Sequence, residues 1–199
     1  GGPKVTLFSA FRDIVVEPEI WKLGCVYFMY GFSYIIYLTF FVAYLTKEIG
    51  VVPVAAGKIF AVLGIFSIFC GVVWGGISDV LGRRYGSLLA YITLALSYVL
   101  FAFWKDTAGF YISAVIFGIA AWSIPTIMAA ASGDAVGGRL APAGLGFITL
   151  FFGIGQALGP VIGGWLKDST GTFTNAFLLA TIVSLIGGFG SLILKKRTK

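Results

Sequence analysis

The sequence predicts an all-α membrane protein, a bundle of six transmembrane helices built from two inverted three-helix repeats. Of the 199 residues, 59% are hydrophobic and 11% are charged, whereas charged residues make up about 25% of an average soluble domain. Six apolar stretches each approach the roughly 20 residues that a membrane-spanning helix needs, without the alternating pattern typical of barrel strands. A glycine-rich segment also recurs in two of these stretches, which indicates an internal repeat.

The elements are expected in the following order. Residues 1–20 are polar and mixed in charge, and they predict a cytosolic linker with a short amphipathic piece. A six-helix transmembrane bundle is expected over 21–199, with spans at about 21–46, 54–78, 84–104, 109–132, 142–166 and 173–194. Because the connections are short, successive helices are expected to be antiparallel neighbours.

Basic residues are distributed unevenly between the two ends of this bundle. Ten of the fourteen Lys and Arg residues fall on the side that carries both termini. Cytoplasmic loops of membrane proteins carry such an excess of Lys and Arg. The net charge of +6 therefore indicates topology rather than nucleic-acid binding. We expect a multi-pass protein of the cell inner (plasma) membrane, with both termini cytoplasmic.

The residues needed for most enzymes are missing from the sequence. It contains no histidine, and no Asp or Glu falls in the middle of a predicted span. The usual catalytic sets cannot be assembled from what remains. We therefore expect no enzyme, no metal site and no cofactor.

A polar hairpin between the second and third spans, residues 71–86, organises the chain. Small residues there let a neighbouring helix approach closely; these are Gly71, Gly75 and Gly76. Gly82 suits a left-handed helix cap. Arg83 and Arg84 are expected to anchor the cytoplasmic end of the hairpin.

The same glycine pattern returns 88 residues later, as Gly159, Gly163 and Gly164, with Pro160 after the first glycine. Each copy lies in the second helix of a three-helix unit. Three-plus-three inverted repeats form one half of facilitator-type transporters. Chance recurrence of glycine-rich packing faces is the alternative, because Gly is common in membrane helices.

The hairpin resembles the loop signature of the major facilitator superfamily of secondary transporters, roughly G-x-x-x-D-x-x-G-R-R/K. Gly75 or Gly76 matches its first position, and Asp79, Gly82, Arg83 and Arg84 match the rest. Residues 153–164 are similar to the superfamily's glycine-proline helix motif. The resemblance covers nearly the whole chain and implies helices seven to twelve of a twelve-helix carrier. In that family the loop latches the two halves together. Plain topology determinants are the alternative for Arg83 and Arg84, whereas Asp79 is the stronger candidate for a gating residue, because the cytoplasmic excess of basic residues does not account for a carboxylate.

The resemblance also implies that the first and fourth helices line a central cavity. Tyr30, Tyr34 and Tyr37 lie on one face of the first helix, where phenolic groups can bind a polar solute. A packing seam is the alternative for this stripe. In the fourth helix, Trp122 and Ser123 precede Pro125, which is expected to bend the helix and free a backbone carbonyl; a purely structural kink is the alternative.

Gln156 lies among the glycines of the fifth helix. Because a buried amide needs partners, we interpret its side chain as one that forms a hydrogen bond to another helix. As a whole, the sequence predicts half of a secondary active transporter that moves a small organic solute, with anions among the candidates, by alternating access as a symporter or antiporter. The expected partners are membrane lipid, the small-molecule solute, and either the other six-helix half or a second copy. A six-helix channel, or a structural subunit without transport of its own, is the alternative. The substrate cannot be predicted, because it depends on side chains from both halves.

Overall fold

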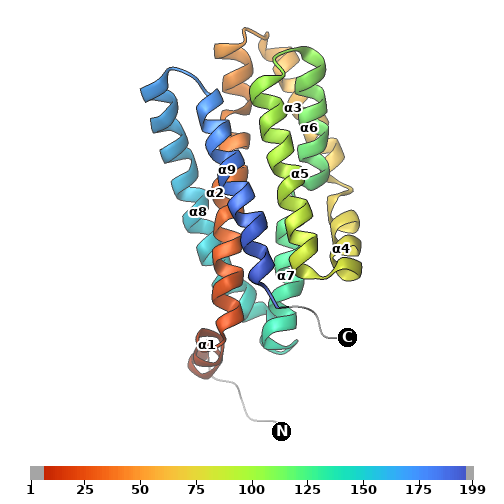
Figure 1. Cartoon of the computed structure of the whole chain (residues 1–199), viewed down its shortest axis with the longest axis vertical. Coiled ribbons are helices and arrows are strands. Elements are labelled where there is room, and N and C mark those ends of the chain that lie inside the picture. The colour runs from red at the N-terminus through yellow and green to blue at the C-terminus, as the bar shows by residue number, and fades with distance from the viewer. Residues whose placement is uncertain (1–6, 196–199) are drawn as a thin grey trace.

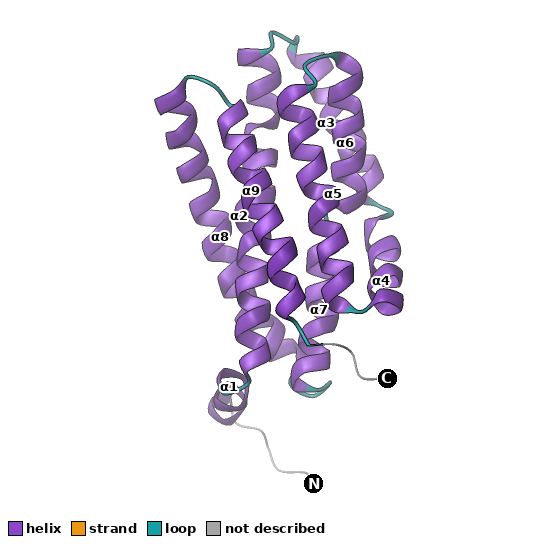
Figure 2. Ribbon diagram, viewed as in Figure 1, coloured by secondary structure: helices purple, strands orange, loops and turns teal. Residues whose placement is uncertain are grey.

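The computed structural model describes residues 7–195, and helices connected by short loops make up this part of the chain, as Figure 2 shows. The elements are α1 (Leu7–Val15), α2 (Pro18–Ala43), the π-helical turn η1 (Tyr44–Glu48), α3 (Pro53–Ser67), α4 (Cys70–Leu81), α5 (Arg83–Phe103), α6 (Thr107–Ala120), α7 (Ser123–Val136), α8 (Ala141–Thr170), α9 (Thr174–Gly190) and the 3-10 turn η2 (Ser191–Ile193). The predicted all-helical fold class is confirmed.

Six spans are present when the broken pair α3–α4 is counted as one of them. Five described helical segments are long and apolar enough to cross a membrane, and α3 and α4 together make a sixth, bent by 46°. The span expected at 54–78 is therefore not continuous, because the helix breaks at Ile68 and Phe69. The span expected at 109–132 is likewise interrupted, at Ala121 and Trp122 between α6 and α7.

Local sequence explains where several helices begin and end. Pro18 stands at the first position of α2, where no N–H is needed, and the Glu17 side chain accepts from the N–H of Glu19. Asp106 caps α6 by accepting from the N–H of Gly109 at 2.8 Å. Gly171 ends α8 at φ +75° in the left-handed conformation, which glycine adopts without steric cost.

The helices form a row with two helices behind it. Along the row, α3 packs against α6, α4 against α7, α7 against α2, and α2 against α8. Helices α5 and α9 pack against each other and cover one side of this row, as Figure 1 shows. We call the opposite side, formed by α4, α7, α2 and α8, the open face.

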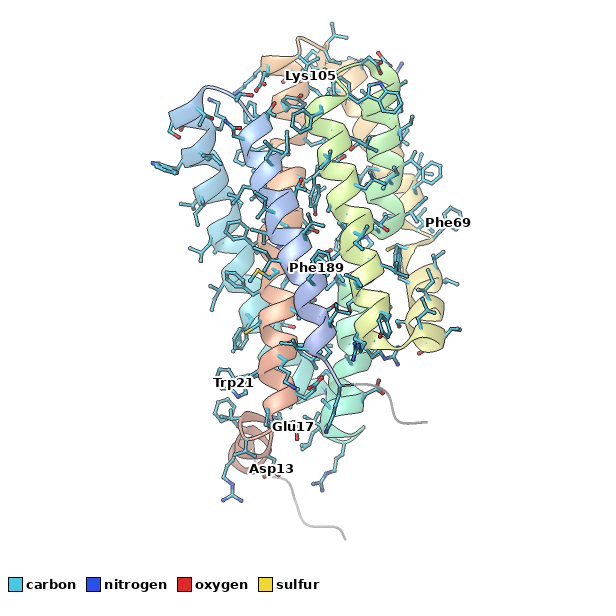
Figure 3. All side chains as sticks on the ribbon, in the orientation of Figure 1. Asp13, Glu17, Trp21, Phe69, Lys105 and Phe189 are labelled. Atoms are coloured by element: carbon cyan, nitrogen blue, oxygen red, sulfur yellow. The ribbon has the colours of Figure 1, made fainter. Side chains whose placement is uncertain are left out.

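Both described ends of the chain lie at the same end of the bundle (Figure 1). The buried carboxylate of Glu19 joins them, because it accepts from the backbone N–H of Lys195 at 2.6 Å and pairs with Lys22 at 3.2 Å. Figure 3 shows Asp13 and Glu17 at this end and Lys105 at the other. Residues 1–6 of the predicted linker and 196–199 of the basic tail lie outside the described residues.

Candidate functional site

The interruption between α6 and α7 exposes backbone carbonyls inside the bundle, and side chains bond to them. In a continuous helix the N–H of residue 125 would donate to the carbonyl of Ala121, but Pro125 has no N–H. The hydroxyl of Tyr30 on α2 donates to this Ala121 carbonyl instead. The hydroxyl of Ser123 donates to the carbonyl of Ala120 at 2.6 Å. The freed carbonyl expected from Pro125 is therefore present, and a tyrosine satisfies it.

The second interruption, between α3 and α4, lies against the first. Cys70, the first residue of α4, accepts the backbone N–H of Trp122 on its sulfur at 3.1 Å. One turn later, the indole of Trp74 donates to the carbonyl of Ile119 at 2.8 Å. Side chains of α4 thus bond backbone groups at the break between α6 and α7. Neither Cys70 nor Trp74 could be identified from the sequence, because a Cys and a Trp in an apolar span give no signal of such contacts.

The tyrosines of α2 divide into two groups. Tyr37 is fully buried, and its hydroxyl shares a hydrogen bond of 2.6 Å with the Ser113 hydroxyl on α6. Its ring packs against Phe117 and Phe101, on the side of α5 and α6. Tyr30 is also fully buried, as described above. In this structure these two tyrosines lie in the packed interior of the bundle.

Tyr34 instead lies toward α8, where it accepts a hydrogen bond from the Gln156 amide. Its ring is stacked on Tyr30, with centroids 4.6 Å apart and an interplanar angle of 4°, and it packs against Phe152 at 5.8 Å. Gln156 therefore does connect two helices. The same contact fixes the orientation of the Tyr34 phenol, which is buried at 5% exposure.

Two further groups, Trp122 at the break before α7 and Thr126 on α7, border the open face. The side chain of Trp122 is 48% exposed, although Ser123 beside it is fully buried. Thr126, one turn along, lies 3.8 Å from the position that a Cβ on Gly71 or Gly75 would occupy. Of the five predicted cavity residues, Trp122 is exposed at the open face, whereas Tyr30, Tyr34, Tyr37 and Ser123 are buried.

The predicted packing glycines behave differently in the two repeats. A Cβ on Gly159 would lie 2.4 Å from the Phe32 carbonyl oxygen, and one on Gly163 would lie 3.1 Å from the Phe40 ring, so α8 approaches α2 closely. Gly164 has ordinary room, at 3.6 Å from Phe40, and Pro160 lies inside α8. In the first repeat the glycines have more room. A Cβ added to Gly71 or Gly75 would lie 3.8 Å from its nearest neighbour in the described chain, and one added to Gly76 would have no neighbour within 4 Å.

At the end that carries both described termini, Arg83 connects three helices. Its side chain is 10% exposed and pairs with Asp79 on α4 at 2.8 Å and with Asp134 on α7 at 2.9 Å. It also donates to the Ser78 hydroxyl at 2.7 Å. The predicted gating loop therefore contains an ionic clamp within the bundle. Asp134 could not be identified as the partner of Arg83 from sequence spacing alone.

The other two residues of the predicted gating loop, Gly82 and Arg84, are not part of this ionic clamp. Gly82 has φ +88° and ψ 157°, so it adopts a positive φ as expected, but not the left-handed helical conformation that was predicted. Arg84 stacks over the ring of Tyr85, with its guanidinium carbon 4.7 Å from the ring centroid. At Gly86, α5 lies close to α4, because an added Cβ there would lie 2.8 Å from the Ser78 Cβ.

Comparison with known proteins places these features in a family. The sequence pattern of the Major Facilitator Superfamily matches residues 23–199. The chain is 30% identical over 158 residues to the "Putative tartrate transporter" of Agrobacterium vitis, a match that covers 75% of this chain and 34% of that protein. It is 25% identical over 185 residues to "Multidrug resistance protein MdtG" of Rahnella sp. (strain Y9602), covering 87% of this chain and 44% of that protein.

Among solved structures, the fold is similar to the crystal structure of the human organic anion transporter MFSD10 (TETRAN). The TM-score is 0.68 at 21% sequence identity, over 90% of this chain and 48% of that chain. The chain spans less than half the length of each of these three relatives.

Proposed function

The chain belongs to the Major Facilitator Superfamily, and from this premise we propose that it forms one half, helices seven to twelve, of a secondary active transporter. The observation that carries the proposal is the match over residues 23–199 to a family of transporters, together with coverage of only 48% of a structural neighbour. A carrier of this kind works by alternating access, as a symporter or an antiporter. We place it in the cell inner membrane with both termini cytoplasmic.

The open face supports the idea that a second six-helix body completes the protein. Trp122 and Thr126 border a surface that α5 and α9 do not cover, and Tyr34 is buried on the α8 side of the bundle, at 5% exposure. A solute bound there would be enclosed only when another half, or a second copy, covers the same face. Ligand sites in bundles lie between helices and are mostly apolar with a few polar groups. The rings of Tyr34 and Trp122, together with the Tyr34 hydroxyl and the Gln156 amide, fit this description.

A small organic anion is the solute class that we propose. The Tyr34 hydroxyl accepts from Gln156, so its own proton is directed to another acceptor, and a carboxylate oxygen is a strong one. No Asp or Glu of this sequence lies in the middle of a span to repel an anion. Two of the relatives are named for tartrate and for organic anions.

Counterflow in phosphatidylcholine vesicles tests the proposal. The chain, alone and together with a six-helix partner half, is reconstituted into vesicles loaded with unlabelled tartrate, and the entry of radiolabelled tartrate and other small dicarboxylates is measured. We expect saturable entry that is stimulated by solute on the opposite side, and only where two halves are present. Entry without saturation or stimulation would favour a channel. Stimulated entry of uncharged solutes alone would overturn the assignment of an anion.

Two tyrosine variants separate solute binding from packing. Tyr34→Phe removes the hydroxyl that accepts from Gln156 on α8, whereas Tyr37→Phe removes the hydroxyl that bonds Ser113 on α6. We expect Tyr34→Phe to raise the concentration for half-maximal counterflow and Tyr37→Phe to leave it unchanged in the folded fraction. Equal effects of the two variants on this concentration would remove Tyr34 from the proposed site.

The mass of the purified chain in detergent, corrected for bound detergent, shows whether it pairs with itself. A monomer means that the chain needs another half, and transport by this chain alone is then excluded. A dimer that is lost in Asp79→Arg means that the loop joins two copies. Because Asp79 also pairs with Arg83 within the half, Arg83→Gln serves as the control that breaks this pair without reversing a charge.

A further inference from the structure

The short helix α1 lies outside the six spans, at the end of the bundle that carries both described termini (Figure 1). We propose that α1 is a membrane-surface helix, whose apolar side enters the boundary between lipid headgroups and acyl chains beside the outer flank of α8. The predicted linker is then not a free cytosolic segment. The proposal does not depend on the transported solute.

Three contacts fix α1 to the bundle. Ile14 is 2% exposed and belongs to the hydrophobic core. The indole N–H of Trp21, on α2, donates to the carbonyl of Val15 at 2.9 Å, which satisfies a carbonyl at the C-terminal end of α1. The ring of Phe11 meets Phe147 of α8 edge-on, with centroids 6.0 Å apart. The position of α1 relative to α2 and α8 is therefore defined.

The aromatic residues of this region form a cluster on one flank of α8. Trp21 packs edge-on against Phe147 and Phe151, at 5.4 and 5.7 Å. The next residue, Phe152, packs instead against Tyr27 at 4.7 Å. Because successive residues of a helix point about 100° apart, the Phe147–Phe151 flank faces away from the open face, toward the outside of the bundle.

Much of this cluster is exposed, although it is apolar. Phe11 is 55% exposed and Trp21 is 44% exposed. Figure 3 shows Trp21 at the side of the bundle, above Asp13. Leaving large apolar side chains in water costs about 25 cal/mol per Å² of apolar surface. A contiguous exposed set of this kind therefore indicates an apolar partner.

Lipid is the partner that fits, because the cluster continues a surface that already faces lipid. Further along the same flank of α8, Ile154 is 55% exposed and Leu158 is 42% exposed, and α8 is one of the membrane-spanning helices. The boundary of the bilayer that covers this flank therefore reaches Phe147 and Phe151, and with them Phe11 and Trp21. Tryptophan is also enriched at this level of membrane proteins.

The geometry of α1 agrees with a helix in the plane of the membrane surface. In Figure 1 it is seen nearly end-on, whereas α2 and α8 run along the bundle. Arg12 and Asp13 are exposed, and the helical period places them opposite the side that carries Phe11 and Ile14. Helices of this type lie with the apolar face buried roughly 5–10 Å into the interface. Since one exposed residue is basic and the other acidic, we expect binding by apolar burial, independent of anionic lipid.

Spin labels on the full chain in phosphatidylcholine vesicles test the proposal. Phe11→Cys and the matched control Asp13→Cys are each labelled in a Cys25→Ser background, since Cys25 is the exposed native thiol. Collision rates with oxygen, which concentrates in lipid, and with a water-soluble nickel chelate are then compared. We expect oxygen collisions to exceed nickel collisions at residue 11, and the reverse ratio at residue 13.

Two results would overturn the proposal. If residue 11 collides with nickel as often as residue 13 does, α1 lies in water. If residue 11 is shielded from both reagents, protein covers the cluster, as a second copy or the other half would. Two further labels calibrate the collision ratios in the same vesicles. Ile154→Cys, on the lipid-facing flank, gives the ratio expected in lipid, and Lys105→Cys, in an exposed loop, gives the ratio expected in water.

Discussion

At the scale of single residues, Arg83 shows how a motif residue expected at the membrane rim is used inside the fold. A buried guanidinium is stabilised only when several acceptors surround it, and here two carboxylates and a hydroxyl do so. The two carboxylates are partly exposed, at 60% and 44%, so solvent weakens each pair. The clamp is therefore moderate in strength.

Replacing Arg83 by Gln should lower the stability of the folded chain by about 1–2 kcal/mol, the usual range for hydrogen bonds to charged groups after solvent screening. The loss should show as a lower midpoint of thermal unfolding in detergent. Arg84→Gln is the matched control, because Arg84 stacks on its neighbour Tyr85 rather than joining helices. We expect a change of under about 0.5 kcal/mol for it, as for surface residues. Equal losses in both variants would contradict the clamp.

Tyr30 and Pro125 act on the same carbonyl from two sides. Tyr30→Phe leaves the Ala121 carbonyl without its donor, and a buried unsatisfied group costs about 1–3 kcal/mol. Pro125→Ala supplies a backbone N–H at the position that a continuous helix would use. We therefore expect Tyr30→Phe to cost clearly less stability in a Pro125→Ala background than in the native chain. The unfolding midpoints of the native chain, the two single variants and the double variant give the coupling between Tyr30 and Pro125. If the losses of stability are additive, the two groups are independent.

At the scale of elements, the two copies of the glycine repeat have different uses within the bundle. On α8 the glycines face α2 and allow backbone contact, whereas the glycines of α4 have room around them. The sequences of the copies are alike, so the difference arises from which helix packs on each. The loose copy lies beside Thr126 at the open face, where the proposed second half would add its own contacts.

Substituting Ala for Gly155 should destabilise the bundle, because the new Cβ would lie 2.4 Å from the Phe28 carbonyl oxygen and the two helix backbones would have to separate. Gly153→Ala, two residues away with nothing within 4 Å, is the control, and it should be neutral or slightly stabilising since Ala favours helix. Unfolding midpoints in detergent measure both. If Gly153→Ala is as unstable as Gly155→Ala, the loss of stability does not come from the close contact between α8 and α2.

At the scale of the whole molecule, the arrangement of the ends agrees with the distribution of basic residues. The loops that contain Arg83 and Arg139 belong to the end with both described termini, and Lys105 lies at the other end (Figure 3). The helices on either side of the breaks are also connected at this end. Breaks separate α4 and α7 from α3 and α6, and Arg83 joins α4, α5 and α7 at one end of the bundle.

The proposed orientation predicts the side from which single cysteines react in intact cells or sealed vesicles. In a Cys25→Ser background, a membrane-impermeant maleimide should label Lys105→Cys from outside and Arg139→Cys only after the membrane is opened, because both positions are exposed on opposite ends. Cys70 is buried and should stay unlabelled. Labelling of Arg139→Cys from outside would reverse the topology.

The sequence by itself determined the helical class, the six spans and the family, because membrane insertion depends on local hydropathy and the loop motif is contiguous. It also indicated the proline break and the bond made by Gln156, since a missing N–H and a buried amide have local consequences. Tertiary structure alone decided that Trp122 is exposed at the open face while Tyr30, Tyr34, Tyr37 and Ser123 are buried. It alone paired Arg83 with Asp134 and Cys70 with Trp122. These outcomes depend on how helices rotate and break against one another, and hydropathy carries no information about the azimuth of a helix that is apolar on all sides.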